Sequence, residues 1–194
     1  MLKEYKRAVT IYLESNPNPN SLKFVANFML VPEAMSFDYP TLESAENCPL
    51  AQELFNYAFV ERVFVMSNFI TVTKKAEVEW MDVQDFIKDH VKKYLESGKA
   101  VIQEDLSKDP LFDENDSETV KKIKGILDEY IRPAVEQDGG AIGFHSFNDG
   151  VVKVLLQGSC SGCPSSTITL KAGIENLLKR MLPNEVREVV AEGA

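Results

Sequence analysis

Residues 138–163 read DGGAIGFHSFNDGVVKVLLQGSCSGC, and they carry the clearest structural signal in the chain. Two runs that alternate apolar and polar residues, AIGFHSF and VVKVLLQ, stand on either side of Asp149-Gly150. An Asp-Gly pair between two such runs predicts a β-hairpin, because both residues tolerate the left-handed backbone angles of a tight turn. Cys160 and Cys163 follow the second predicted strand, so the sequence places a CxxC pair at a strand end.

A helix is predicted before this hairpin. It begins after Asp116-Ser117, either of which can cap a helix, and it ends at the DGG segment, residues 138–140. We expect Pro133 to kink its last turn. Its predicted apolar stripe consists of Val120, Ile123, Leu127, Tyr130 and Ala134.

A second helix is predicted after the cysteines. It opens at Pro164 and ends at Pro183-Asn184, and VREVV at residues 186–190 is predicted as a final short strand. This half of the chain is therefore expected to be α+β, with helices on one side of a small sheet. Most apolar residues of the second helix fall on one face: Ile168, Leu170, Ile174, Leu177, Leu178 and Met181.

The first half of the chain also has an α+β pattern. RAVTIYLES and SLKFVANFML are predicted strands separated by the NPNPN loop, because prolines cannot extend a paired strand. CPLAQELFNYAF is predicted to form a short helix with Pro49 in its first turn. ERVFVMSNFITVTKK predicts a hairpin about Ser67-Asn68, and a long amphipathic helix is expected from about Glu79 to Glu96.

Residues 97–115 between the two halves lack a regular pattern. This segment has five acidic and two basic residues, which favours a solvated linker, although Val101-Ile102 and Leu111-Phe112 could dock on a neighbouring surface. We therefore expect two small domains, 1–96 and 116–194, each a small sheet with helices packed on one side.

The composition narrows the classes of function. The 194 residues carry a net charge of -9, which argues against a nucleic-acid partner, because phosphate contacts need clustered Lys and Arg. The densest apolar run, FVANFMLV at residues 24–31, is too short to span a membrane, and the first residues show no export or transit signal. Three cysteines, an odd number, do not suggest a secreted disulfide framework, so the expected location is cytoplasmic.

The CxxC pair supports two chemistries. Two thiols are half of the four that a closed zinc or iron–sulfur site needs, and they are also enough for a redox dithiol. Cys163 enters the predicted helix, where the first backbone N–H groups favour a thiolate. Gly158 and Gly162 let the backbone bend and approach a bulky ligand. The spacing alone leaves the metal and redox interpretations open.

Neither histidine is expected to act as a base for a cysteine nucleophile. Folding the hairpin symmetrically about Asp149 makes His145 face the region of Lys153, and Cys160 lies about 20 Å further along the strand at about 3.3 Å per residue. His90 falls in the long helix of the other half, where it is expected to be packed or solvated. The same register puts residues 138–140 opposite Cys160, and their small side chains would leave room beside the sulfur.

The residues from about Ile123 to Val189 resemble the C-terminal domain of NifU, the iron–sulfur cluster scaffold. The IRP, DGG, DGVVKV and GSCSGCPSS blocks occur in the order expected of that family. In the first half, TIYLESNPNPNSLKF, CPLAQELF and FITVTKKAEVEW resemble the N-terminal domain of Nfu-type proteins. The resemblance implies an iron–sulfur cluster carrier and no enzyme activity, with Cys160 and Cys163 as the cluster ligands.

The resemblance also implies a cofactor and partners. Two chains related by a two-fold axis would supply four thiolates to a [4Fe–4S] cluster, which gives a homodimer when the cluster is loaded. A [2Fe–2S] form is left open. The carrier would receive the cluster from upstream cluster assembly proteins and pass it to apo iron–sulfur enzymes by ligand exchange. The alternatives are a thioredoxin-like dithiol oxidoreductase, which needs more strands than this half supplies, and a structural zinc site shared across a dimer.

Two positions depart from the pattern of this family. It usually has an acidic residue after DGG, where this chain has Ala141, and it is expected to have a serine near Cys48. Because Cys48 belongs to the other domain, we expect it to be a lone buried thiol and not a third ligand.

Overall fold

The computed structural model of the chain describes residues 8–33, 35–103, 116–161 and 164–193, without the side chains of residues 164–166. Within these residues there are two domains, each a β-sheet with helices on one face, which confirms the predicted α+β class.

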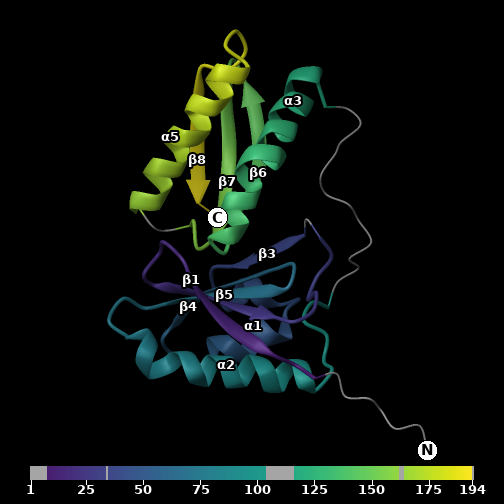
Figure 1. Cartoon of the computed structure of the whole chain (residues 1–194), viewed down its shortest axis with the longest axis vertical. Coiled ribbons are helices and arrows are strands. Elements are labelled where there is room, and N and C mark those ends of the chain that lie inside the picture. The colour runs from purple at the N-terminus through teal and green to yellow at the C-terminus, as the bar shows by residue number, and fades with distance from the viewer. Residues whose placement is uncertain (1–7, 34, 104–115, 162–163, 194) are drawn as a thin grey trace, which may run out of the picture.

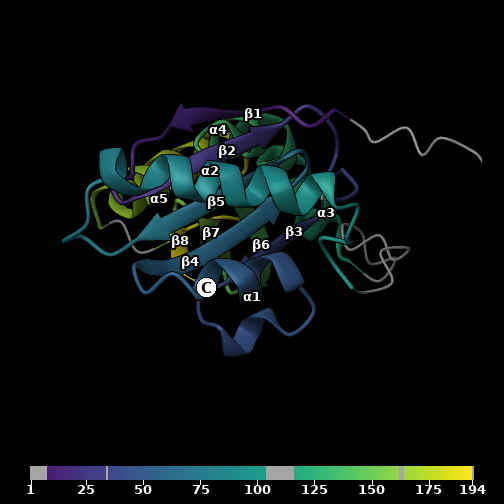
Figure 2. The same ribbon diagram turned by 90° about the horizontal axis from the view of Figure 1, so that it is seen from below.

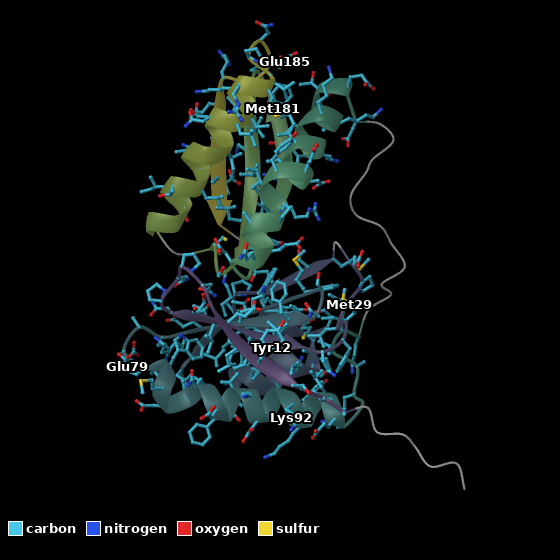
Figure 3. The ribbon with its side chains drawn as sticks, in the orientation of Figure 1. Tyr12, Met29, Glu79, Lys92, Met181 and Glu185 are labelled. Atoms are coloured by element: carbon cyan, nitrogen blue, oxygen red, sulfur yellow. The ribbon has the colours of Figure 1, made fainter. Side chains whose placement is uncertain are left out.

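The two domains are stacked end to face (Figure 1). Helix α2 (Trp80–Glu96) covers one face of the first sheet, and the second domain stands on the opposite face. Figure 3 shows the consequence for the ends of the molecule: Lys92 on α2 and Glu185 in the second domain lie far apart at opposite ends. The end of the second domain that carries Cys160 is the end that meets the first domain, because Asn18 hydrogen-bonds to the neighbouring Ser159.

The first sheet, as far as the structure describes it, has five antiparallel strands in the order β1-β2-β5-β4-β3. The two predicted strands and the hairpin are confirmed, and Ser67 in the hairpin turn has a φ of 48°. The edge strand β3 was missed, because four alternating residues are the shortest signal a strand can give. The strands are β1 (Ile11–Ser15), β2 (Ser21–Ala26), β3 (Ser36–Tyr39), β4 (Val60–Met66) and β5 (Phe69–Lys74).

The helices of the first domain pack on one face of this sheet, and Figure 2 shows α2 crossing its strands. The 3-10 turn η1 (Glu43–Ala45) precedes helix α1 (Pro49–Phe55), which has Pro49 at its start as predicted. Ile87 and Val91 of α2 are fully buried against the strands.

Two residues of the predicted linker also belong to this core. Val101 and Ile102 are 8% and 7% exposed and pack in the hydrophobic cluster of the first domain, so their predicted docking is confirmed. Leu111-Phe112 lies outside the described residues. The extent of the linker, residues 97–115, stays a prediction.

The second domain has a sheet of order β6-β7-β8 in the described residues, with β7 antiparallel to β6 and parallel to β8. The predicted hairpin turn is confirmed, with φ angles of 48° at Asp149 and 78° at Gly150. The predicted cap is also confirmed, because Ser117 Oγ accepts a hydrogen bond from Val120 N at 3.3 Å. The elements are α3 (Glu118–Ile126), a π turn (Leu127–Ile131), α4 (Arg132–Gln137), β6 (Gly140–Asn148), β7 (Val151–Gly158), α5 (Pro164–Met181) and β8 (Glu188–Gly193).

The apolar stripe predicted for the helix before the hairpin is wrong beyond Leu127. Tyr130 is 49% exposed, and Val135 is buried in place of Ala134. The π turn between α3 and α4 adds a residue to the helical path and so shifts the buried face by one position. Pro133 has no N–H and its ring crowds the preceding turn, which favours such an irregular turn just before it.

The stripe predicted for α5 is wrong at both ends. Ile174 and Leu178 are fully buried, whereas Ile168 is 70% exposed and Met181 is 42% exposed. Ile168 precedes Ile174 by six residues, or about one and two-thirds helical turns, so it points away from the buried face. Met181 is the last residue of the helix, and the next residue, Leu182, is buried in the core of the domain in its place.

Candidate functional site

Cys160 lies in the tight turn that follows β7. Ser161 N donates to Gly158 O at 3.1 Å, and Gly158 has a φ of 64°, which a glycine adopts without strain. The Cys160 residue is only 6% exposed and packs in the hydrophobic cluster of the second domain. Cys163 lies outside the described residues, so the pairing of the two predicted ligands stays a prediction. Helix α5 begins at Pro164, the next residue of the sequence.

The DGG turn lies directly beside Cys160, as the predicted hairpin register requires. Gly140 pairs with Gly158, and Ser159 N donates to Gly139 O at 3.3 Å. A Cβ atom on Gly140 would lie 2.9 Å from Cys160 Sγ and 2.6 Å from the carbonyl oxygen of Gln157. Only glycine fits at position 140, because any side chain would overlap the Cys160 sulfur and the Gln157 carbonyl group.

A cavity of about 410 Å³ opens beside Cys160. The second domain contributes Ala134, Asp138 and Leu170 to its wall, and the first domain contributes Pro17 and Asn18. Burial raises the pKa of the Asp138 carboxyl, and the charge of Lys23 opposes that rise. The cavity is thus a space between the domains with Cys160 on its border.

Three side chains of the first domain hold the backbone of the loops around Cys160. Asn18 Nδ2 donates to Ser159 O at 3.1 Å, and Thr71 Oγ1 donates to Gly139 O at 2.7 Å. Asp38 Oδ2 accepts from Gly158 N at 3.2 Å. No local pattern in the sequence indicates these contacts, because each joins residues more than 60 positions apart.

Asp38 is a buried carboxylate at the contact between the two domains. Arg62 Nη1 lies 2.8 Å from Asp38 Oδ2, and the Asp38 side chain is 2% exposed. Burial raises the pKa of the Asp38 carboxyl, and the Arg62 guanidinium and the Gly158 N–H partly offset that rise.

The histidines are remote from residues 159–161 after β7, which we call the cysteine loop, in line with the sequence-based expectation. A β-bulge at His145 lies between the pairs Phe144–Val154 and Ser146–Lys153, so His145 lies in the region of Lys153, as predicted. His145 Nδ1 lies 3.5 Å from Glu192 Oε2, and the side chain is 56% exposed. His90 contacts Tyr57 and a glutamate of α1 inside the first domain, so it is a packed helix residue.

Cys48 is a structural thiol. It is fully buried, and its sulfur accepts a hydrogen bond from Ala51 N at 3.4 Å, which caps the start of α1. Burial raises the pKa of the Cys48 thiol to about 11. Within the described part of the chain, no group of three or more His, Cys, Asp or Glu side chains is placed to hold a metal ion.

The fold and the site together define a class: a two-domain α+β protein that carries a thiol in a glycine-bordered turn between a strand and a helix. The family model described as "Scaffold protein Nfu/NifU N terminal" matches residues 11–98, and the "NifU-like domain" model matches residues 123–190. A Drosophila willistoni protein named as a mitochondrial NFU1 iron–sulfur cluster scaffold homolog is 40% identical over 185 residues. The human protein of the same name is 40% identical over 178 residues, which are 91% of this chain and 70% of that protein. The chain belongs to the Nfu/NifU family of iron–sulfur cluster scaffold proteins.

The relatives are longer than this chain. It covers 64% of the length of the Drosophila protein, with 95% of its own residues matched. The names of these relatives include the word mitochondrial, which does not support the cytoplasmic location expected from the sequence. The solution NMR structure of a NifU-like protein from Saccharomyces cerevisiae is 26% identical, with a TM-score of 0.47, and covers 54% of this chain and 93% of that one. None of the described helices has the length and apolar character needed to cross a membrane.

Proposed function

We propose that this chain carries a [4Fe–4S] cluster between proteins and that Cys160 and Cys163 are its ligands. The observation that carries the proposal is the position of Cys160, a residue that borders a cavity and whose sulfur lies against a turn where only glycine fits. Family membership supports a cluster as the cargo, because the relatives are named as iron–sulfur cluster scaffolds.

The number of thiols supports a cluster shared by two chains. The chain has three cysteines, and Cys48 is buried in the core of the other domain as a helix cap. Cys160 and Cys163 are therefore half of the four thiolates that a [4Fe–4S] cluster takes. A two-fold axis through the site brings the same pair from a second chain and completes the set.

Transfer from such a site needs only ligand exchange. A thiolate of the acceptor protein replaces one thiolate of the carrier at each iron, and the released cysteine takes up the proton that the acceptor thiol loses. The cluster keeps its iron, sulfide and electrons, so the carrier needs no enzymatic turnover. The donors in this scheme are upstream cluster assembly proteins, and the acceptors are apo iron–sulfur proteins.

The carrier must work where thiols stay reduced. A disulfide between Cys160 and Cys163 would remove both ligands at once. The cytoplasm, expected from the sequence, meets this requirement. Because the relatives are named as mitochondrial, the mitochondrion is the first compartment to test. Microscopy of the tagged chain in its own cells would locate it.

Metal and sulfide analysis of protein purified without oxygen tests the function. We expect wild-type protein to hold iron and sulfide in equal amounts, and Cys160→Ser or Cys163→Ser to abolish stable cluster binding, because each removes half of a chain's ligands. Cys48→Ser is the matched control, and it should bind a cluster as the wild type does.

Two results would contradict the proposal. Stoichiometric zinc without sulfide would indicate the structural metal site, and disulfide-reductase activity of the iron-free protein would indicate the dithiol oxidoreductase. Loss of iron in the Cys48→Ser protein would show that the ligand assignment is incomplete.

A further inference from the structure

The face of the first sheet opposite its helices is apolar, and the second domain covers it. Val25, Phe64, Met66 and Phe69 lie on this face, which we call the docking face, and each is at most 3% exposed. They pack with Ala141 of β6, which is 5% exposed. Because separation of the domains would expose this apolar surface to water, its burial favours the contact.

The loops around Cys160 approach the docking face more closely than side chains would allow. A Cβ atom on Gly158 would lie 2.8 Å from the ring of Phe64, and a Cβ atom on Gly139 would lie 2.8 Å from Thr71 Oγ1. Both glycines also have positive φ angles, 64° and 78°. The docking face therefore packs directly against the backbone at Gly139 and Gly158, with no room for a side chain at either position.

Lys23 adds a charge-based contact to the same region. Its ammonium donates to the carbonyl oxygen of Glu136 at 3.2 Å, near the end of α4, and lies 4.3 Å from the centre of the Phe69 ring. Carbonyl groups at the end of a helix carry a partial negative charge, which suits a lysine. Most of the polar contacts across this interface thus bind main-chain groups of the second domain.

The interface also contains polar atoms that it does not satisfy. Asn16 Nδ2 and Asp38 Oδ1 are buried without a hydrogen-bond partner among the described residues. Such groups regain hydrogen bonds to water when an interface opens, which offsets part of the apolar burial. This mixture is typical of a contact between domains that separate and reassociate.

We propose that the first domain covers the cysteine loop of the cluster-free chain and must move away before a second chain can reach Cys160. The inference rests on the shared cluster of the proposed function. Ser159 is 1% exposed and its carbonyl accepts from Asn18 Nδ2 at 3.1 Å, and the Pro17–Asn18 segment forms part of the wall of the cavity that Cys160 borders. The first domain therefore competes with the second chain for one loop, and cluster binding favours the open form by mass action.

The double variant Asn18→Ala/Thr71→Val tests the contact in the cluster-free full chain. It removes two hydrogen bonds to the loops but keeps Asp38, the acceptor of the Gly158 N–H. Hydrogen exchange of the Gly158 amide, followed by NMR, reports opening, because this proton exchanges when it leaves Asp38. We expect exchange at least about tenfold faster than in the wild type, which is the order of effect of a lost hydrogen bond to a buried carbonyl.

The double variant Asn27→Ala/Thr41→Val is the matched control. It makes the same chemical changes at residues whose described contacts stay in the first domain: Asn27 binds Ala8 and Thr10, and Thr41 Oγ1 accepts from Ser44 N at 3.3 Å. Its Gly158 amide should exchange at the wild-type rate. Equal exchange in the wild type and the Asn18→Ala/Thr71→Val variant would overturn the proposal, and so would equal acceleration in both variants.

Cluster loading tests the competition itself. The same proteins receive iron and sulfide without oxygen, and size-exclusion chromatography follows dimer formation with time. We expect the Asn18→Ala/Thr71→Val variant to form the loaded dimer about tenfold faster than the wild type, in proportion to its open population. Faster exchange with unchanged loading would overturn the competition while the proposed function stands. If none of the proteins loads a cluster, the proposed function fails, and the amide exchange still reports the domain contact separately.

Discussion

Single residues show how the surroundings of a thiol set its role. Cys48 caps the start of α1, where its sulfur accepts a hydrogen bond from Ala51 N. Burial raises the pKa of the Cys48 thiol to about 11, so it stays a neutral thiol at neutral pH. A serine hydroxyl would meet the same structural need, because serine is among the best helix caps. Cys160 lies beside a cavity between the domains, in the turn that follows β7.

The Cys48→Ser variant should change the stability of the chain at alkaline pH. The folded-state pKa of Cys48, about 11, exceeds the ordinary value of 9.0, so its contribution is complete below pH 9 and is lost as the pH rises through 11. That loss is about 2 kcal/mol by pH 11 in the wild type and should be absent from the variant. Urea unfolding at pH 7 to 11 measures both, and parallel pH dependences would contradict the assignment.

Ala141 is the residue whose small apolar side chain permits the domain contact. Ala141→Glu would place a longer, charged side chain against Phe64, Met66 and Phe69, each at most 3% exposed, so the domains should separate. We expect the Gly158 amide to exchange at least about tenfold faster than in the wild type, because overpacking and desolvation of the carboxylate both oppose the contact, even with Lys124 and Arg132 lining the neighbouring cavity.

The control for Ala141→Glu is Ala76→Glu, which adds the same charge at an exposed turn of the first domain. Its Gly158 exchange should equal that of the wild type. Wild-type exchange in the Ala141→Glu protein would show that the apolar docking face does not depend on residue 141.

At the scale of elements, the helical path from α3 to α4 shows how one local irregularity changes a buried face. Ile123 and Leu127 face the core before the π turn, and Val135 does so after it. The same path ends at Gly139, whose φ of 78° turns the chain into β6 beside Cys160. The π turn and the glycine together therefore set the position of the DGG turn relative to the cysteine loop.

The start of α3 offers a test of local stability. Ser117→Ala removes the side-chain acceptor of the Val120 N–H and should destabilise the second domain by about 1 kcal/mol. Ser117→Asp keeps an acceptor at the cap and should retain or raise the stability. Urea unfolding followed by circular dichroism measures the change, and equal midpoints for Ser117→Ala and the wild type would show that the cap contributes nothing.

At the scale of the whole molecule, each domain has its own core, and the candidate site lies where they meet. The hydrophobic clusters of the first and second domains share no residue, and a third, smaller cluster joins the docking face to Ala141. Family membership and the thiol count both support a role in cluster transfer, which needs a site that can open. A contact between separately folded domains can open without unfolding either of them.

Loading should convert monomers into dimers. With two ligands per chain, the cluster binds only the paired state and stabilises it by mass action, so cluster-free protein should elute as a monomer at low concentration. Loaded protein should elute as a dimer with about four irons and four sulfides per two chains, and chelation of the iron should restore the monomer. Anaerobic size-exclusion chromatography with iron and sulfide assays measures this. A fully loaded monomer would rule out the shared site.

The elements with local signals could be predicted from the sequence. Asp149-Gly150 specified the hairpin turn, Pro49 the start of α1, and Ser117 the start of α3, because turn and cap residues act through the few backbone groups next to them. The hairpin also predicted that the DGG turn would lie beside Cys160, since strand pairing carries a turn's register along both strands.

The surroundings of the cysteine loop and the choice of buried faces depend on the packed structure. The π turn shifted a predicted buried face by one residue, the bulge at His145 interrupts the pairing of β6 with β7, and neither has a distinct periodic signal. The contacts of Asn18, Asp38 and Thr71 with the loop cross from one domain to the other. Hydrophobic periodicity indicates that a face is buried, but it does not identify the partner, because burial depends on surface removed from water and not on what removes it.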